Sequence, residues 1–248
     1  MIPEITIIIP TYGLMATIGA LLAILFLYYN LMVCENNLNI SKMSEFWLLC
    51  VLCGLGCLIG SRLIYVLSQL KCIIENLSVQ NIIDHVFFGG FVFYGGLIGA
   101  FIGAFIYSKI KHVDKLELYN VLTPGFVIFH AAGRIGCLFA GCCYGFKLEK
   151  ELVVGNVHFN YFPIQAVEAV FEFLIFFLLC NSSLKKKRFI SYMTVYPIYR
   201  FIAEFFRGDI ERGLIFNIST SQIISILILI YVLKTLFISK NGSKALIN

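Results

Sequence analysis

The sequence predicts an all-α membrane protein with about seven transmembrane helices in a single domain, residues 1–248. Three observations support this fold class. Of the 248 residues, 60% are hydrophobic and 13% are charged, with a mean hydropathy of +0.90, whereas a soluble domain carries about 25% charged residues. The apolar residues form long runs, and a helix needs about 20 residues to cross a bilayer. Lysine and arginine gather in alternate connections between these runs.

Seven apolar segments are candidates for membrane-spanning helices. The first four are long and contain few charged residues. The fifth and sixth are shorter and each contains charged residues, which need polar partners inside a membrane protein. In chain order the segments are residues 12–32, 46–70, 87–110, 118–138, 164–180, 191–206 and 220–237.

The basic residues predict the orientation, because cytoplasmic connections carry an excess of Lys and Arg. With the N-terminus outside, eleven basic residues fall in inner segments and five in outer segments, so we expect N-out and C-in. The inner residues are Lys42, Lys109, Lys111, Lys115, Lys185, Lys186, Lys187, Arg188, Lys234, Lys240 and Lys244, and the outer residues are Lys71, Lys147, Lys150, Arg207 and Arg212.

Charge and cysteine content exclude two other classes. The net charge of +5 mostly reflects the cytoplasmic bias, which anionic lipids favour, so it does not indicate nucleic-acid binding. The nine cysteines lie mainly in apolar segments, where a free Cys behaves as a small hydrophobe. We therefore expect no disulfide framework. Cys50, Cys53 and Cys57 share one helical face, and packing is the favoured interpretation for them.

The second and third segments contain closely spaced glycines. Arg62 follows two of them, and this spacing lets two helices approach closely. Arg62 either belongs to a polar site or extends to the membrane interface. The glycines of the third segment form a smooth face beside Tyr94, which suits helix packing or contact with an acyl chain. These glycines are Gly56 and Gly60 in the second segment, and Gly95, Gly96, Gly99 and Gly103 in the third.

Residues 133–145, at the end of the fourth segment, are the most informative stretch. Arg134 lies there among closely spaced glycines at the end of an apolar run. An arginine inside a span costs about 2.5–3.5 kcal/mol on insertion scales, so it requires a polar cavity, a carboxylate or an anionic ligand. His130 shares the helical face of Arg134 one turn earlier. It is either a neutral, hydrogen-bonded core residue or a second cation.

Charged residues with helical spacing also mark the fifth and sixth segments. Two interpretations remain open: a structural ion-pair network, in which Arg134 pairs with Glu168 or Glu204, or a near-neutral cavity that receives an anionic substrate. The residues are Gln165, Glu168 and Glu172, which follow a helix-starting proline at Pro163, and Arg200, Glu204 and Arg207, which share one side of the sixth segment.

Two arginines facing a lipid-accessible cavity suit a phosphate group, because the guanidinium fork donates two parallel hydrogen bonds to phosphate oxygens. Phospholipid is the phosphate source in a membrane. Breaking the bond between a glycerol carbon and a phosphate oxygen builds negative charge on the phosphate, which such a clamp stabilises. The sequence has no phosphate-binding loop and no dense acidic cluster, so we expect no metal, nucleotide or other cofactor.

Cys142 and Cys143 lie close to Arg134 in the sequence, on the outer side of the predicted topology. Three interpretations are open: a strained vicinal disulfide, a metal site, or a pair of inert thiols. No spacing of the cysteines matches a zinc set, so the sequence does not indicate a metal site.

Several motifs in the same order resemble the prolipoprotein diacylglyceryl transferases of bacterial inner membranes. Gly133-Arg134-Ile135-Gly136 is similar to the signature of that family. The further motifs are Ile9-Pro10-Thr11-Tyr12-Gly13-Leu14, Gly60-Ser61-Arg62-Leu63-Ile64-Tyr65, Gly95-Gly96-Leu97-Ile98-Gly99, Phe162-Pro163-Ile164-Gln165 with Glu168-Ala169, and Tyr199-Arg200-Phe201-Ile202-Ala203-Glu204-Phe205-Phe206-Arg207.

The resemblance implies transfer of the diacylglyceryl group of phosphatidylglycerol to the lipobox cysteine in the signal peptide of a lipoprotein precursor, forming a thioether and releasing glycerol phosphate. It also implies a multi-pass protein of the bacterial cytoplasmic membrane, among membrane lipids, with its active site towards the outer side. Implied catalytic residues are Arg134, Arg200, Tyr94 and His130, and implied substrate-binding residues are Tyr12, Arg62, Gly95, Gly96, Glu168, Glu204, Arg207, Cys137 and Cys142.

Two positions depart from the family pattern. Tyr94 stands where the family has a histidine proposed to assist thiol deprotonation, and tyrosine is a poor base at neutral pH. After Arg134, Cys137 and Cys142 fall within a stretch where the family has amides and a carboxylate. Either another residue, such as His130, acts as the base, or the cationic field activates the thiol, or the acceptor differs.

Three alternative functions follow from the same residues. A phospholipid-dependent transferase with a different acceptor keeps the lipid half of the reaction. A lipid-binding or transport protein keeps the anion site without the chemistry. A membrane thiol oxidoreductase uses the pair Cys50 and Cys53 or the pair Cys142 and Cys143.

Overall fold

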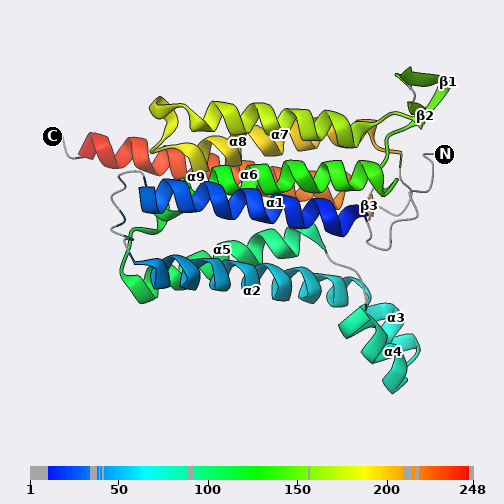
Figure 1. Cartoon of the computed structure of the whole chain (residues 1–248), viewed down its shortest axis with the longest axis horizontal. Coiled ribbons are helices and arrows are strands. Elements are labelled where there is room, and N and C mark those ends of the chain that lie inside the picture. Colours follow the sequence, from blue (N-terminus) through cyan, green and yellow to red (C-terminus); the bar gives the residue numbers. More distant parts are fainter. Residues whose placement is uncertain are drawn as a thin grey trace. The chain divides into compact units, whose positions relative to one another are not determined.

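A computed structural model describes residues 11–33, 38, 40, 42–88, 92–155, 157–208, 214–215 and 218–245. Ile9, Pro10 and Arg212, named above, lie outside the described residues. A helix lies in each of the seven predicted segments (Figure 1). These helices are α1 (Thr11–Tyr28, continued by the π-helical turn η1, Tyr29–Val33), α2 (Met43–Ser68), α5 (Phe93–Lys111), α6 (Lys115–Phe139), α7 (Ile164–Cys180), α8 (Arg188–Ala203) and α9 (Thr220–Ala245).

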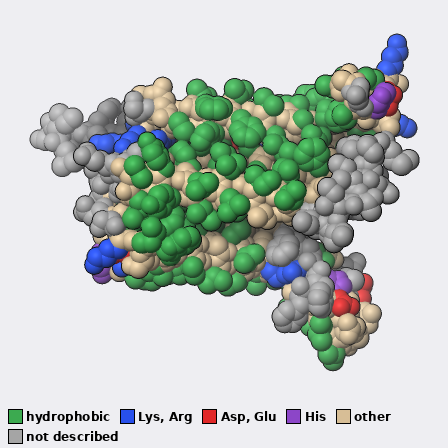
Figure 2. Space-filling model, in the orientation of Figure 1, with side chains coloured by type: hydrophobic (Ala, Val, Ile, Leu, Met, Phe, Trp, Pro, Cys, Tyr) green, Lys and Arg blue, Asp and Glu red, His purple; other side chains and the backbone are tan. Residues whose placement is uncertain are grey.

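Three helical segments among the described residues are long and apolar enough to cross a membrane: Thr11–Val33, Met43–Leu67 and Lys115–Phe139. A shorter apolar helix spans Ser221–Leu236. Large apolar side chains on these and neighbouring helices are exposed, and Figure 2 shows hydrophobic side chains across the visible face of the helices. Leu25, Ile59 and Phe177 are each more than 60% exposed. Lipid tails are the solvent that such a surface requires.

Three parts of the chain differ from the expectation. The third helix begins at Phe93 instead of residue 87, because residues Asp84–Phe88 form a separate π-helical turn, η2. Two short helices, α3 (Leu70–Glu75) and α4 (Val79–Ile83), precede that turn. Two small antiparallel hairpins interrupt the otherwise helical chain: β1 (Lys147–Val154) with β2 (Val157–Tyr161), and β3 (Leu214–Ile215) with β4 (Ile218–Ser219).

The first hairpin has a local cause that hydropathy does not reveal. Val153, Val154 and Val157 flank its turn, and Val favours extended backbone. The register places Val154 opposite Val157. Gly155 adopts a positive φ of 61° at the turn, a conformation that glycine reaches without steric cost. The hairpin therefore forms from sequence signals of strand and turn within the connection between α6 and α7.

The contacts divide the chain into two compact units, which we describe separately. One unit comprises Met1–Phe26 with Leu122–Asn248, and the other comprises Leu27–Val121.

In the unit Leu27–Val121, α2 packs closely against α5, and glycines form the contact. A Cβ atom at Gly56 or Gly60 would collide with the backbone carbonyl of Gly99 or Gly95, and a Cβ at Gly96 would lie 3.0 Å from the sulfur of Cys57. Small residues allow helix backbones to approach in this way in membranes. The structure thus supports the helix-packing interpretation of Gly95 and Gly96, while their role in substrate binding stays a prediction.

Replacing Gly99 by valine should destabilise this helix pair. A side chain at Gly99 meets the backbone of α2 at Gly56, and overpacking of a tight contact typically costs about 1–3 kcal/mol. The matched control is Gly54→Val on α2, because a Cβ at Gly54 meets no atom within 4 Å. Thermal unfolding in detergent should show a lower midpoint for Gly99→Val than for Gly54→Val. Equal midpoints would show that the glycine contact contributes nothing to stability.

In the other unit, α1 and α6 to α9 form a helix bundle (Figure 1). A Cβ atom at Gly136 would lie 3.2 Å from Tyr12 Cδ2, so this glycine allows α1 to approach α6 near the end that carries Arg134. Aromatic rings fill the contact between α7 and α8, where Phe171 and Tyr199 stack with their centroids 3.7 Å apart. This bundle positions the polar residues described next.

Candidate active site

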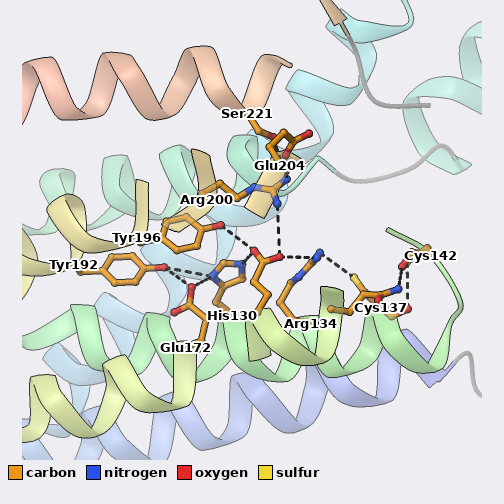
Figure 3. A network of polar contacts seen from close by, with 12 residues as sticks. His130, Arg134, Cys137, Cys142, Glu172, Tyr192, Tyr196, Arg200, Glu204 and Ser221 are labelled. Carbon is orange, nitrogen blue, oxygen red and sulfur yellow. Dashed lines mark hydrogen bonds and ion pairs between the residues drawn. The ribbon is translucent and has the colours of Figure 1, made fainter. Parts of the chain in front are cut away.

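Regular helical spacing places the polar side chains of three helices at matching levels of the bundle. Side chains four residues apart lie on the same helix face, one turn from each other. The facing residues therefore form successive pairs along the helix axes (Figure 3). They are His130 and Arg134 on α6, Glu172 and Glu168 on α7, and Tyr192, Tyr196 and Arg200 on α8, with Glu204 following in the 3₁₀ turn η4 (Glu204–Phe206).

Glu168 lies at the centre of this network and joins the two buried arginines. Its Oε2 atom is 2.7 Å from Arg134 Nη2 and 3.6 Å from Arg200 Nη1. The hydroxyl group of Tyr196 donates a hydrogen bond of 3.3 Å to the other oxygen, Oε1. The Glu168 side chain is almost fully buried, so the three partners stabilise a carboxylate that has lost its water.

Arg200 has a second set of partners at the end of α8. Its Nη2 atom is 2.9 Å from Glu204 Oε2 and donates a hydrogen bond of 3.2 Å to Ser221 Oγ at the start of α9. The guanidinium is thus held between two carboxylates, one on α7 and one following α8. This arrangement fixes the direction of its planar fork.

His130 forms the deeper end of the network. Its Nδ1 atom is 2.9 Å from Glu172 Oε1, and the hydroxyl oxygen of Tyr192 is 3.3 Å from both of these atoms. The Nε2 atom of His130 lies 4.0 Å from Glu168 Oε1. Both ring nitrogens therefore face carboxylates of α7.

The network combines two guanidinium groups with three carboxylates, all at most 8% exposed. A proton on His130 would make the positive and negative charges equal. Charges removed from water cost several kcal/mol each unless they are paired. The pairing explains why this apolar bundle tolerates so many ionisable groups.

A tight turn after α6 brings three cysteines close to Arg134. The Sγ atoms of Cys137, Cys142 and Cys143 all lie within 4.8 Å of one another. Arg134 Nη1 is 3.8 Å from Cys137 Sγ, and the Nε2 group of Gln165 donates a 2.6 Å hydrogen bond to the carbonyl oxygen of Cys142. The cysteine turn is thereby connected to α6 and to the start of α7.

The charge around Cys143 favours its thiolate form. Hydrogen bonds from the thiols of Cys137 and Cys142, together with the positive charges of Arg134 and Arg207, lower the pKa of the Cys143 thiol from its usual value. An opposite charge or a donated hydrogen bond favours the ionised form in this way.

Backbone hydrogen bonds tie the residues after α8 to the residues after the cysteine turn. The N–H group of Phe146 donates to the carbonyl oxygen of Phe206 at 3.0 Å, and that of Gly208 donates to Tyr144 at 3.1 Å. Arg207 pairs with Gly145 through an isolated β-bridge. Arg207 is therefore adjacent to the cysteine turn, although more than sixty positions separate them in the sequence.

A cavity of about 260 Å³ lies beside the cysteine turn. Gly141 and Tyr144 from the turn line it, together with residues of the β2 strand and the start of α7. Gln165 is also part of its lining, and the buried Oε1 atom of this side chain has no hydrogen-bond partner among the described residues. The cavity thus offers space and a polar group next to the three thiols.

The structure brings together most of the site residues predicted from the sequence. Arg134, Arg200, Glu168, Glu204 and His130 form one network, with Cys137 and Cys142 next to Arg134 and with Arg207 beside the cysteine turn. Tyr12 packs near Gly136 on the same unit. The remaining predicted residues belong to the other unit, namely Arg62 on α2 and Tyr94, Gly95 and Gly96 on α5.

Several network residues received no site role from the sequence. Tyr192 and Tyr196 precede Arg200 at intervals of four, so the helical stripe that predicted Arg200 extends to them. Glu172 was placed on the correct helix face without a role in the site. Ser221 carries no signal of its own in the sequence, because a single hydroxyl near a helix start is common. For Cys143 the sequence leaves open a disulfide with Cys142, a metal site, an inert thiol and a redox pair.

A bundle of apolar helices that buries two arginines around a shared carboxylate defines a helical membrane protein with a buried polar site. The sequence profile described as prolipoprotein diacylglyceryl transferase matches residues 2–238 of the chain. This match covers nearly the whole sequence. The chain therefore belongs to the prolipoprotein diacylglyceryl transferase family.

Individual relatives agree with this assignment. A phosphatidylglycerol–prolipoprotein diacylglyceryl transferase of Clostridium tetani is 35% identical over 189 residues, covering 71% of this chain and 73% of the relative. The second such transferase of Clostridium perfringens is 33% identical over 232 residues, covering 89% and 87%. A relative from Staphylococcus aureus is 29% identical over 187 residues, covering 69% and 66%.

Proposed function

We propose that this protein transfers the diacylglyceryl group of phosphatidylglycerol to the thiol of a lipobox cysteine in a lipoprotein precursor. The products are a thioether and glycerol phosphate. The observation that carries this proposal is the buried pair of guanidinium groups, Arg134 and Arg200, held by Glu168 in a chain of this family. The two guanidinium forks at this carboxylate are hydrogen-bond donors of the kind that suits a lipid phosphate.

Arg134 has a hydrogen-bond donor to offer to the phosphate. Its buried Nε–H group has no hydrogen-bond partner among the residues that the structure describes. A phosphate oxygen at this donor gains a charge-assisted hydrogen bond in a site of low dielectric. Because negative charge grows on the departing phosphate, this interaction strengthens in the transition state and lowers the barrier.

Glu168 and Glu204 act as positioning residues for the two arginines. Each carboxylate lies within 3 Å of a guanidinium nitrogen, so it limits the rotation of the fork. His130 extends this support, because its ring lies between Glu172 and Glu168 and faces neither the cysteine turn nor an open cavity in the interactions described above. In this proposal His130 orients Glu168 and is not the base for the acceptor thiol.

The remaining predicted residues take part in substrate binding in this proposal. Tyr12, Arg62 and Arg207 contribute to lipid binding, with Gly95 and Gly96 on the α5 helix. Tyr94 takes the place of the family's histidine, and its weak basicity leaves activation of the thiol to another group. Residues 1–248 form one domain in which both units contribute to the enzyme.

We place the site at the outer face of a bacterial cytoplasmic membrane, in a protein with seven spans, N-out and C-in. Four polar residues lie near the same end of the bundle, namely Arg134 towards the end of α6, Glu168 near the start of α7, Arg200 near the end of α8 and Ser221 at the start of α9. The connection between α7 and α8, at the opposite end, contains Lys185, Lys186 and Lys187. Basic connections favour the cytoplasmic side, which places the site outside.

The proposal predicts transfer by the purified full-length protein in phosphatidylglycerol vesicles. A peptide with a lipobox cysteine should gain the mass of one diacylglyceryl group, as measured by mass spectrometry. A peptide with serine at that position should gain nothing, and vesicles of phosphatidylcholine alone should not support transfer. Phosphatidylglycerol binding without any modified peptide would instead favour a lipid-binding protein or a different acceptor.

One variant separates the transferase from a thiol oxidoreductase that uses the α2 cysteines. The double substitution Cys50→Ser and Cys53→Ser removes that thiol pair from a helix outside the arginine network. Transfer to the peptide should continue at the wild-type rate. Loss of transfer with an intact fold would contradict the proposed mechanism.

A further inference from the structure

The three thiols of the cysteine turn have the geometry of a zinc site. Their Sγ atoms lie within 4.8 Å of one another. Tetrahedral zinc holds its sulfur ligands at about 2.3 Å, which corresponds to sulfur–sulfur distances of about 3.8 Å. A shift of about 1 Å or less, within reach of side-chain rotation, is enough to bring all three sulfurs to a metal ion. The spacing in the sequence did not indicate such a set, because the turn supplies the proximity.

The backbone of the turn holds the thiols in this arrangement. The N–H group of Cys142 donates to the carbonyl oxygen of Cys137 at 3.1 Å, and Gln165 holds the Cys142 carbonyl from α7. Gly141 has a φ of 68° and Cys143 a φ of 58°. A positive φ at a residue with a side chain is strained and persists where the surrounding structure imposes it. The turn is therefore constrained in a shape that directs three sulfurs to one point.

Three thiols match the number of protein ligands that a catalytic zinc ion takes. No fourth His, Cys, Asp or Glu joins the cluster among the residues that the structure describes. Structural zinc sites have four protein ligands, whereas catalytic sites have three and keep one position open. A cavity of about 260 Å³ is lined by Gly141 and Tyr144, which are next to Cys142 and Cys143 in the sequence.

The charges around the cluster suit three thiolates with a divalent ion. Three thiolates and one Zn²⁺ carry a net charge of −1. The guanidinium of Arg134, 3.8 Å from Cys137 Sγ, lies next to that charge. The same arginine belongs to the proposed phosphate site, so the metal position and the lipid phosphate position are neighbours.

We propose that Cys137, Cys142 and Cys143 bind one zinc ion, and that the acceptor cysteine binds this ion as its fourth ligand. This inference rests on the proposed function. The acceptor thiol releases its proton to solvent when its sulfur binds the metal, because a coordinating thiol is deprotonated. Metal coordination is one of the ways to activate a nucleophile. It would provide the thiolate that Tyr94 is too weak a base to generate.

The transfer step then balances without a further reactant. The acceptor sulfur attacks the glycerol carbon of phosphatidylglycerol and forms the carbon–sulfur bond. The bond between that carbon and the phosphate oxygen breaks, and its electron pair remains on the glycerol phosphate beside Arg134 and Arg200. The thioether sulfur is neutral and binds zinc weakly, so the product can leave.

Zinc binding is tested first, without reference to activity. The purified full-length protein is reduced, freed of metal with a chelator, and titrated with Zn²⁺ in competition with a chromophoric indicator. We expect one Zn²⁺ per chain. Cys137→Ser, Cys142→Ser and Cys143→Ser should each weaken binding by at least about tenfold, the lower end of the effect of altering a zinc site. The control Cys180→Ser, an exposed cysteine at the end of α7, should bind zinc as the wild type does.

Binding of the acceptor cysteine at the fourth coordination position of the metal ion is tested with Co²⁺ in place of Zn²⁺. The lipobox peptide should change the thiolate-to-cobalt charge-transfer absorption of the wild-type protein, and the serine peptide should not. The zinc site is overturned if the wild-type protein binds no zinc. It is also overturned if the three serine variants bind zinc as tightly as the wild type. Isolation of two of the three cysteines as a disulfide, in a protein that binds no zinc after reduction, overturns it in favour of a redox role. If the lipobox peptide leaves the cobalt spectrum unchanged, the acceptor cysteine does not bind the metal ion, and this part of the inference is overturned.

Failure of this inference can be distinguished from failure of the proposed function. Transfer at an unchanged rate by metal-free protein overturns the zinc inference and leaves the transferase proposal intact. A protein that binds zinc and the cysteine peptide but never yields a diacylglyceryl peptide overturns the transferase proposal and leaves the metal site.

Discussion

Replacing Arg134 by alanine is expected to lower the transfer rate by at least about 100-fold, the typical effect of removing one preorganised transition-state donor. Arg134 offers its free Nε–H group to the lipid phosphate while Glu168 holds the other side of the fork. Arg134→Lys keeps the positive charge but loses the planar fork, so it should recover little activity. Mass spectrometry of the diacylglyceryl peptide measures the rate.

The controls separate loss of chemistry from loss of structure. Lys234→Ala removes an exposed positive charge from α9 and should leave the rate unchanged. The circular dichroism of Arg134→Ala in detergent shows whether the bundle remains folded. Transfer by a folded Arg134→Ala protein at a rate near the wild type would contradict the role of Arg134 in phosphate binding.

Replacing Glu168 by glutamine is expected to cause the largest loss of stability. Both arginines lose the carboxylate that they share, and removing one partner of a buried ion pair typically costs about 3–5 kcal/mol because the remaining charge is left uncompensated. Arg200 retains Glu204, whereas the interactions described for Arg134 include no other carboxylate. The free energy of unfolding in detergent, with a denaturant, measures this effect.

Two further variants test whether Glu168 is the carboxylate that contributes most to the stability of the network. Glu149→Gln changes an exposed carboxylate on β1 and should leave the free energy of unfolding within error of the wild type. Glu204→Gln should destabilise less than Glu168→Gln, because it affects one arginine that keeps a second partner. A stability for Glu168→Gln equal to that for Glu149→Gln would contradict the central position of Glu168.

Physical rules that act along a helix explain which parts of the site could be predicted. Arg134 could be placed in a site because an arginine costs too much in lipid without a partner. Glu168 and Arg200 followed from helical spacing, and their opposite charges implied contact. The structure confirms the ion-pair interpretation, because Arg134 pairs with Glu168, while binding of an anionic substrate stays a prediction.

Other parts depended on contacts between segments that spacing does not encode. Tyr196 looked like one more aromatic residue of an apolar helix, yet its hydroxyl supports Glu168. The predicted start of the third helix at residue 87 was wrong, because Asp84–Phe88 forms a separate π-helical turn and α5 begins at Phe93. Gly96 suited a lipid contact as well as a helix contact, and only the proximity of Cys57 favours packing.

The sequence by itself determined that the chain is a helical membrane protein with buried arginines and glutamates, because hydropathy and helical periodicity are properties of single segments. Only the tertiary structure decided how these groups are paired, since one carboxylate at Glu168 meets arginines of two other helices. It alone brought Cys137, Cys142 and Cys143 to one point, because a turn with two positive φ angles and a hydrogen bond from Gln165 folds the chain back on itself. Distances between side chains depend on such turns and helix contacts, which no local pattern records.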